Sequence, residues 1–341
     1  MKKAAFIAAI SLLLFSFFGC TQKTEPVTST LFVMTTDVSQ KVYGSNADKA
    51  IEKVESYLKE SEKRLSTYLA ESEISKINEN AGIEPVHVSD DTFRLIKKAK
   101  ALSEASEGHF DLTVAPLSKL WNISGENPIV PSEDAIRQAL ALVDYRNVIL
   151  DEASSTVYLT QTGMAIDLGG IAKGAFCSDI AKIYQEYEVE SALISIGGNI
   201  FTYNLKPDKT PYKLGIRNPM SSNASSAMGV FETHDEVIAT SGAYERYFEQ
   251  NGVVYHHILD LSTGMPSQSD LLSVTVISED GALADYLSTT LYLAGKEAIP
   301  SYIDRENFSV IVIDKEQNVY ISPSIRDRFT ITANEYTEVI G

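Results

Sequence analysis

The feature that most constrains the fold is a change in hydrophobic spacing near Tyr145. Before it, apolar residues recur every three or four positions, as in amphipathic helices, notably after Asn46 and Ser89 and over residues 132–143. After it, short apolar and β-branched runs alternate with turn residues, as in strands. No linker of domain-separating length divides the two parts. The sequence therefore predicts an α+β fold of mixed sheets with flanking helices. Its helix-rich N-terminal half and strand-rich C-terminal half would form two interlocked subdomains.

Individual elements follow from the same spacing. We expect helices over residues 46–65, 92–106, 132–143, 171–187 and 281–294, with a short one inside 64–80. Strands are expected over residues 31–43, 148–150, 157–160, 192–196, 212–216, 229–238, 253–258, 272–277, 309–313 and 319–321.

The N-terminus has the pattern of an export signal. Lys2 and Lys3 precede an apolar run over residues 4–18, which is too short for a convincing membrane span. Gly19 before Cys20 resembles a bacterial lipobox, although Phe17 stands where leucine is usual; the alternative is an ordinary signal peptide with an incidental cysteine. We expect a signal peptide over 1–19, lipid on Cys20 and a tether over 21–30. The protein would then be exported and anchored to the bacterial membrane, on its periplasmic or cell-surface side.

Charge and cysteine content exclude other classes. The net charge of −17 argues against a nucleic-acid surface, which needs clustered lysine and arginine. An anionic ligand must therefore be held by backbone amides, a metal or a few well-placed cations. Apart from Cys20, the only cysteine is Cys177, so no intramolecular disulfide framework is possible. Cys177 lies in a helical pattern and is expected to be buried.

The stretch "AIDLGGIAKGAF", residues 165–176, places a glycine pair between a strand-like and a helix-like run. It matches neither G-x-x-x-x-G-K-[ST] nor G-x-G-x-x-G. Gly169 and Gly170 could form a tight turn with conformations closed to other residues. They could instead let the backbone approach a phosphate at a helix N-terminus. A second glycine pair in "SIGGNI", residues 195–200, favours this second interpretation.

The stretch "ADYLSTTLYLAG", residues 284–295, carries a candidate metal site. Asp285 and Thr289 are four residues apart and share a helix face, with Ser288 beside them. One carboxylate with hydroxyls suits Mg²⁺, which keeps waters and takes further oxygens from substrate phosphates. The alternative is an aspartate that complements the helix dipole and a threonine that faces solvent.

Two adjacent histidines, His256 and His257, stand out among only five in the chain. Side chains of neighbouring residues in a strand point to opposite faces, so at most one of them would line a given site. The alternative is one exposed and one packed histidine. A zinc site is not expected, because no third ligand stands at the usual spacing.

Together these segments resemble the ApbE family, over roughly residues 31–325. The matching stretches, in order, are "LFVMTTDVSQKVYG", "STYLAESEISKIN", "GHFDLTVAPLSKLW", "DLGGIAKG", "SIGGNI", "ATSGAYERYF", "HILDLSTGMP" and "SVTVISEDGALADYLSTTLYLAG". The family consists of FAD:protein FMN transferases, often exported as lipoproteins. The resemblance implies one such domain over residues 31–341. Thr35 and Leu261 depart from the family pattern, but neither position supplies a necessary side-chain function.

The resemblance implies Mg²⁺-dependent transfer of FMN from FAD to a Thr or Ser hydroxyl of a partner protein, with release of AMP. Asp285 and Thr289 would be metal ligands, with Ser288 or the Gly170 carbonyl nearby. His257 is implied as the general base and His256 is the second choice; Asp285 would be catalytic through the metal. The positions implied to contact the flavin nucleotide are Met34, Tyr68, His109, Phe110, Asp111, Asp167, Lys173 and Leu259.

The acceptor implied by the family carries a D-x-x-[ST]-x-A-T segment, on membrane electron-transfer subunits or small FMN-binding domains. This chain has no such segment, so self-modification is not expected. Two alternatives stay open: a Mg²⁺-dependent FAD pyrophosphatase that gives FMN and AMP, and a non-catalytic flavin-binding lipoprotein. The second predicts loss of the metal ligands, whereas Asp285 and Thr289 are both present.

Overall fold

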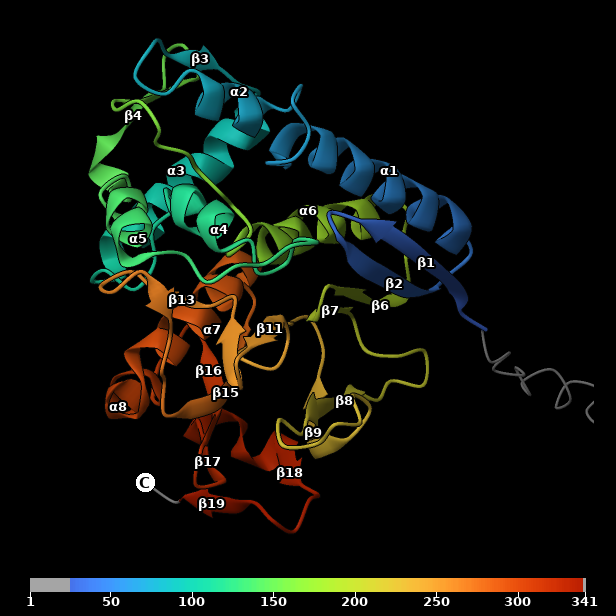
Figure 1. Ribbon diagram of the computed structural model, residues 1–341. Helices are drawn as coiled ribbons and strands as arrows, with labels where there is room; N and C mark the ends of the chain where they lie inside the picture. Colours follow the sequence, from blue (N-terminus) through green and yellow to red (C-terminus); the bar gives the residue numbers. More distant parts are fainter. Residues whose placement is uncertain (1–24, 340–341) are drawn as a thin grey trace, which may run out of the picture.

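The computed structural model describes residues 25–339, so the expected signal peptide and Cys20 lie outside the described part. A sheet of nine strands in the order β1-β2-β6-β7-β10-β15-β16-β17-β19 is the largest element (Figure 1). Its strands pair antiparallel, except β17 and β19, which pair parallel. The α+β prediction, with helices concentrated in the first half and strands in the second, is confirmed. Among the described residues, no helix is both long and apolar enough to span a membrane.

The helices are α1 (Ala47–Leu65), α2 (Glu73–Glu79), α3 (Asp90–Ala105), α4 (Ala115–Trp121), α5 (Glu133–Leu140), α6 (Ala172–Glu186), α7 (Gly281–Ala294) and α8 (Ile299–Tyr302). Three 3₁₀ turns cover Tyr145–Asn147, Lys296–Ala298 and Pro323–Arg328. The strands of the large sheet are β1 (Val27–Val33), β2 (Thr36–Tyr43), β6 (Ser191–Ile196), β7 (Asn199–Tyr203), β10 (Val237–Gly242), β15 (Leu271–Ser278), β16 (Ser309–Asp314), β17 (Asn318–Ile321) and β19 (Thr337–Val339). The small sheets are β18-β9-β8 (Phe329–Ile331, Ala227–Thr233, Tyr212–Arg217), β3-β5-β4 (Val86–His87, Thr156–Leu159, Val148–Asp151), β11-β12 (Tyr247–Gln250, Val253–His256) and β13-β14 (Leu259–Asp260, Met265–Pro266).

The N-terminal hairpin joins the two halves of the chain. The single strand expected over residues 31–43 is instead two strands, because the chain reverses at Met34 and Thr35, which both have positive φ (53° and 56°). Residues 27–30, expected in the tether, form the first part of β1. Because β2 pairs with β6, this hairpin extends the sheet of the C-terminal half.

Helix α1 forms as its pattern predicts. Its buried face includes Ala50, Ile51, Val54 and Leu58, which recur at the helical spacing. Asn46 occupies the N-cap position, but its side chain does not cap the helix and donates to the Tyr187 carbonyl at 3.2 Å. The helix therefore depends on burial of its apolar face rather than on the expected cap.

Short elements differ most from the sequence expectations. The strand expected over 229–238 is divided into β9 and β10, because the chain turns at Asp235 with a φ of 56°. Helix α4 and strands β7 and β11 were not expected. Each spans seven residues or fewer, too few for a clear hydrophobic period.

The main hydrophobic core draws on both halves. It contains Val54 and Leu58 of α1 together with Val274 and Val312 of the large sheet, all fully buried. Cys177 lies in this core as expected, and burial raises the pKa of its thiol. The shared core supports the expectation of interlocked rather than separate subdomains.

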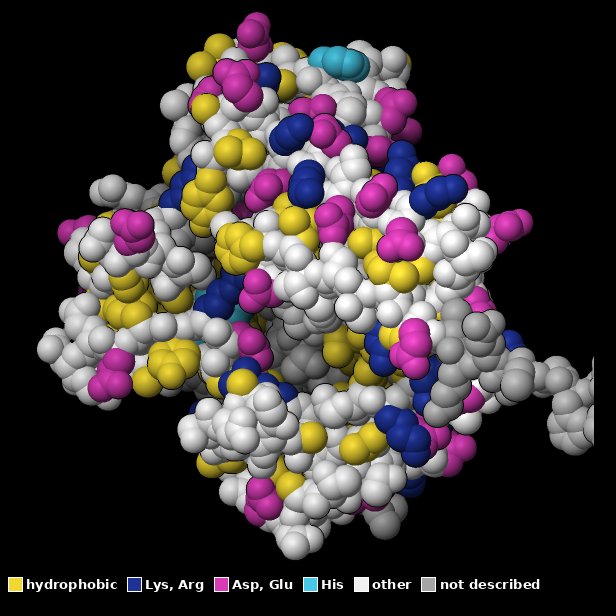
Figure 2. Space-filling model, turned by 90° about the vertical axis from the view of Figure 1, so that its right-hand side faces the viewer, with side chains coloured by type: hydrophobic (Ala, Val, Ile, Leu, Met, Phe, Trp, Pro, Cys, Tyr) yellow, Lys and Arg dark blue, Asp and Glu magenta, His cyan; other side chains and the backbone are white. Residues whose placement is uncertain are grey.

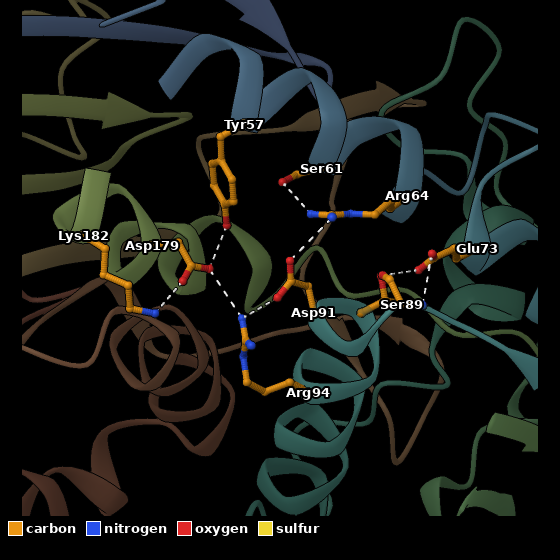
Figure 3. A network of polar contacts seen from close by, with 10 residues as sticks. Tyr57, Ser61, Arg64, Glu73, Ser89, Asp91, Arg94, Asp179 and Lys182 are labelled. Carbon is orange, nitrogen blue, oxygen red and sulfur yellow. Dashed lines mark hydrogen bonds and ion pairs between the residues drawn. The ribbon is translucent and has the colours of Figure 1, made fainter. Parts of the chain in front are cut away.

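A polar network fixes α6 against α1 and α3 (Figure 3). Asp179 of α6 accepts hydrogen bonds from the Tyr57 hydroxyl at 2.9 Å and from the Lys182 ammonium at 2.8 Å. Arg94 of α3 lies 3.7 Å from Asp179 and 3.0 Å from Asp91. Burial, and then the Asp179 charge, raise the pKa of Tyr57, so this phenol stays protonated as a donor. The network holds in place the helix whose N-terminus forms part of the candidate site.

Candidate active site

Helices α6 and α7 cross in direct backbone contact. A Cβ atom added to Gly174 would lie 1.9 Å from the Gly281 carbonyl oxygen, and one added to Gly281 would lie 2.2 Å from the Gly174 carbonyl oxygen. No side chain fits between them. The crossing brings "DLGGIAKG", at the start of α6, next to "ADYLSTT" of α7.

Asp285 of α7 contacts the N-terminal turn of α6. Its side chain is buried, and its Oδ2 accepts a hydrogen bond from the Gly174 backbone N–H at 3.1 Å. The Lys173 ammonium lies 3.5 Å from the same oxygen and donates to the Gly169 carbonyl at 2.9 Å. The carboxylate therefore faces the positive end of a helix dipole as well as a cation. Within the described chain, no hydrogen bond ends on its other oxygen, Oδ1.

The glycine pair is a point of close approach, not of unusual conformation. A turn is present, because the Ile171 N–H donates to the Leu168 carbonyl at 3.1 Å, but neither Gly169 nor Gly170 has a positive φ, so the expected conformation closed to other residues is wrong. A Cβ on Gly170 would lie 3.0 Å from the Phe110 ring, which in turn packs edge-on against Tyr286 at 5.3 Å between centroids. The Gly169 N–H donates to Asp167 at 2.8 Å. The expected contact residues Phe110, Asp167 and Lys173 therefore gather around this loop.

The second glycine pair has a structural role. Gly197 and Gly198 form the turn between β6 and β7, with φ values of 54° and 92°. A Cβ on Gly197 would lie 2.5 Å from the Thr36 hydroxyl oxygen at the start of β2. The turn conformation and the packing against Thr36 account for both glycines, so no contact with a phosphate is needed to explain them.

Three hydroxyls gather beside Asp285. Ser241 at the end of β10 places its Oγ 2.9 Å from the Ser288 Oγ and 3.0 Å from the Thr289 Oγ1. The Ser288 hydroxyl donates to the Asp285 backbone carbonyl at 2.9 Å. Ser241 was not among the residues expected from the sequence. It lies in the quoted stretch "ATSGAYERYF", but nothing local to that stretch indicates contact with a helix about 45 residues later.

The donor set fits Mg²⁺ better than a transition metal. The described residues contain no group of three or more His, Cys, Asp or Glu side chains able to hold a metal ion. Asp285 supplies one carboxylate oxygen without a hydrogen bond, and Thr289 and Ser288 supply hydroxyl oxygens. Mg²⁺ accepts such a sparse oxygen set, because water and substrate phosphates complete its shell.

The two histidines face opposite ways, as expected. His256 is buried, with Nε2 donating to the Ser267 carbonyl at 2.8 Å and Nδ1 accepting the Ile258 N–H at 3.3 Å. Its ring also packs edge-on against Tyr292. Burial lowers the pKa of His256. Both ring nitrogens are occupied, so His256 is a packing residue and not a base.

His257 is the exposed member of the pair. Its Nδ1–H donates to the Arg246 carbonyl at 3.2 Å, because a carbonyl can only accept. This tautomer leaves Nε2 without a proton. The side chain is exposed to solvent, yet protein atoms surround much of the ring. Desolvation, followed by the positive charge of Arg246, lowers the pKa of His257 to about 4. The ring is therefore neutral at physiological pH and can accept a proton at Nε2.

Two residues expected to contact the nucleotide have other roles. Asp111 is buried, and its carboxylate accepts from the Thr113 N–H and hydroxyl and from the Tyr145 N–H, at 2.6–2.8 Å. Desolvation raises the pKa of Asp111 despite these bonds. Leu259 is also buried and packs with Trp121 in a small core under α4 and α5. Both side chains therefore make their contacts with other residues of the protein.

The remaining expected contacts lie on loops. The Met34 N–H donates to Glu62 at 2.7 Å, and the partly buried His109 precedes Phe110. The Tyr68 side chain is 79% exposed, so its ring is free to stack on a ligand. Neither Met34 nor Tyr68 has a hydrogen bond or ion pair to the Lys173–Asp285 pair within the described residues. Figure 2 shows a hollow in one face of the molecule, with basic and histidine side chains at its edge.

Comparison with known families decides the assignment. The model of the ApbE family matches residues 34–312. The chain belongs to the ApbE family. The resemblance seen in the motifs is therefore confirmed.

Curated relatives of this chain carry the name FAD:protein FMN transferase. One from Klebsiella pneumoniae (strain 342) is 38% identical over 274 residues, which cover 80% of this chain and 84% of the relative. One from Treponema pallidum (strain Nichols) is 34% identical over 296 residues, covering 83% and 82%. The relatives carry an enzyme's name, so the expectation of an enzyme is confirmed for the family to which this chain belongs.

Solved ApbE structures share the fold. The ApbE protein of Thermotoga maritima superposes with a TM-score of 0.80 at 32% identity, covering 89% of this chain and 99% of that one. The flavin transferase ApbE of Vibrio cholerae gives a TM-score of 0.80 at 29% identity, with the same coverage of both chains. The α+β architecture is thus that of the ApbE family.

Proposed function

We propose that this chain transfers FMN from FAD to a Thr or Ser hydroxyl of a partner protein and releases AMP, in a Mg²⁺-dependent reaction. The observation that carries the proposal is the contact between Asp285 of α7 and the N-terminal turn of α6, where Lys173 and the Gly174 N–H meet its carboxylate. An anionic pyrophosphate would find a cation, a helix N-terminus and oxygen ligands for Mg²⁺ at one place. The name of the curated relatives supplies the substrate class.

The bonds balance as a phosphoryl transfer. The acceptor oxygen forms a bond to the FMN-side phosphorus of FAD, and the bond from that phosphorus to the bridging oxygen breaks. AMP leaves with the bridging oxygen, and FMN stays on the acceptor as a phosphoester. The hydroxyl proton goes to Nε2 of His257, which the hydrogen bond to Arg246 leaves unprotonated.

Asp285, Thr289, Ser288 and the Gly170 carbonyl would hold Mg²⁺. When bound, the ion neutralises charge that develops on the pyrophosphate. Lys173 adds a second positive charge, and its bonds to Asp285 and the Gly169 carbonyl fix its position. Phe110 supplies an apolar wall, held in place by Gly170 and Tyr286.

The partner and location complete the proposal. The acceptor would carry a D-x-x-[ST]-x-A-T segment on a membrane electron-transfer subunit or a small FMN-binding domain. Lipid on Cys20 would anchor the exported enzyme to the bacterial membrane, on its periplasmic or cell-surface side. The Gly19-Cys20 pair after an apolar run supports this anchoring.

The deciding experiment incubates the purified chain with FAD and Mg²⁺, with and without an acceptor that bears the segment. AMP release that needs the acceptor, together with an acceptor mass raised by one FMN, is the expected result. AMP and free FMN without any acceptor would mean that water is the nucleophile and that the enzyme is a pyrophosphatase. An acceptor with Ala in place of its Ser or Thr is the matched control.

A further inference from the structure

A line of three hydroxyls connects β10 to α7. Ser241 Oγ lies between Ser288 Oγ, at 2.9 Å, and Thr289 Oγ1, at 3.0 Å. Ser288 continues the line to the Asp285 backbone carbonyl at 2.9 Å. Ser288 is buried, whereas Ser241 and Thr289 are only partly covered. Thr289 is therefore the accessible end of the line.

Each hydroxyl has a single proton, and this fixes which group donates in each hydrogen bond of the line. A carbonyl oxygen can only accept, so Ser288 uses its single proton on Asp285. Ser288 must then accept from Ser241, whose own single proton is thereby used. Ser241 must in turn accept from Thr289. The hydroxyl proton of Thr289 is thus directed into the protein, and its lone pairs are directed away from Ser241.

We propose that Ser241 is a positioning residue that makes Thr289 a pure oxygen donor toward a bound cation. A hydroxyl that ligates a cation offers a lone pair and must place its proton elsewhere, and Ser241 is the acceptor that receives it. Residues that orient a metal ligand in this way raise the affinity of the site. This inference rests on the proposed Mg²⁺-dependent transfer, because that reaction places the cation at Thr289.

The test measures cation binding and not turnover. Mn²⁺ alone is titrated into the metal-free chain, and the free ion is followed by its electron paramagnetic resonance signal. We expect Ser241→Ala to weaken Mn²⁺ binding by about tenfold, the lower end of the usual effect of losing such a partner. Thr289→Val, which removes the ligand oxygen and keeps the shape, should weaken binding at least as much.

Two matched variants control for the loss of a hydroxyl. Thr290→Val affects the neighbouring threonine, whose hydroxyl donates to the Tyr286 carbonyl within α7. Ser273→Ala removes a buried serine hydroxyl on β15, which pairs with β10. Both should bind Mn²⁺ like the wild type. If Ser241→Ala does not fold, Ser241→Cys keeps a side chain of similar shape with a weaker acceptor and should also weaken binding.

The outcomes separate this inference from the proposed function. If Ser241→Ala binds like the wild type while Thr289→Val does not, Ser241 does not orient Thr289 and the inference is wrong. If Thr289→Val also binds normally, the cation lies elsewhere, which overturns the inference together with the proposed metal site. Failure of the wild-type chain to release AMP from FAD, with the expected Mn²⁺ pattern intact, would overturn only the proposed transfer.

Discussion

The His257 ring donates its Nδ1 proton to the Arg246 carbonyl, 3.2 Å away. Because Arg246 precedes β11 and His257 follows β12, the base of one hairpin fixes the tautomer of the histidine. The same arrangement explains why two adjacent histidines differ in role: the His256 ring is held at both nitrogens, and the His257 ring at one.

Replacement of His257 by alanine should slow FMN transfer by about 10²–10⁴-fold, the usual range for loss of a general base. FAD affinity should stay near the wild-type value, since the proposed role of the ring is to accept a proton. Single-turnover AMP release and a separate FAD titration measure the two effects. His234→Ala, at an exposed turn before β10, is the control. Unchanged transfer would assign the base to another group.

The pH dependence should reflect the lowered pKa of His257. A base works in its deprotonated form, so its activity is lost as pH falls through its pKa, here about 4. An ordinary histidine would lose activity near pH 6.5. We therefore expect kcat/KM for the acceptor to be level between about pH 5.5 and 8. A single inflection near pH 6.5 that disappears in His257→Ala would contradict the lowered pKa.

Asp285→Asn should reduce FAD turnover by about a thousandfold or more, because the site loses its one anionic side chain among the proposed ligands. The asparagine can still accept the Gly174 N–H, so the fold should persist. AMP release as a function of Mg²⁺ concentration is the measurement. Glu279→Gln, an exposed carboxylate just before α7, is the control. Wild-type turnover with full Mg²⁺ dependence would remove Asp285 from the metal site.

Gly174→Ala should lower the free energy of unfolding by about 1–3 kcal/mol or more, because its methyl group has no space against the Gly281 carbonyl. Turnover should fall as well, since the two helices that carry Lys173 and Asp285 must move apart. Thermal unfolding and AMP release test both effects. Ser178→Ala, at an exposed position of the same helix, should change neither. A stable and active Gly174→Ala variant would mean that the crossing can widen without cost.

Asp111→Asn should lower the free energy of unfolding by about 1–3 kcal/mol, because an amide nitrogen cannot accept the hydrogen bonds that the carboxylate accepts. FAD affinity should not change, since neither carboxylate oxygen is free. Denaturant unfolding and FAD titration report on these two properties. Asp151→Asn replaces an exposed turn carboxylate and should have a smaller effect on stability. A loss of FAD affinity at normal stability would restore Asp111 to the binding site.

Sequence reasoning succeeded where the information is local. The helix expected over residues 281–294 is α7, and the face shared by Asp285 and Thr289 follows from its period. His256 is buried and His257 exposed, as expected, although β12 ends at His256 and His257 lies just beyond the strand whose alternation led to this expectation. Family motifs added the pairing of distant segments, which hydrophobic spacing alone does not predict.

Long-range contacts account for most of what was missed. Ser241 is close to Thr289 only because β10 packs beside α7. The packing of Gly170 against the Phe110 ring was not predicted, because Phe110 lies 60 residues earlier in the chain. The hydrogen bond from the Tyr145 N–H to the Asp111 carboxylate and the packing of Leu259 with Trp121 were likewise not predicted. A sequence motif does not show which residues, distant in the chain, a side chain contacts in the folded protein.

The glycine crossing of α6 and α7 also limits how the enzyme can move. Helices whose backbones touch at Gly174 and Gly281 cannot rock against each other without a collision, so they behave as one rigid unit. Lys173 and Asp285 then keep their separation throughout a catalytic cycle. Opening and closing around a substrate must come from segments outside this unit, and the exposed Tyr68 loop and the β11–β12 hairpin are the places to measure it.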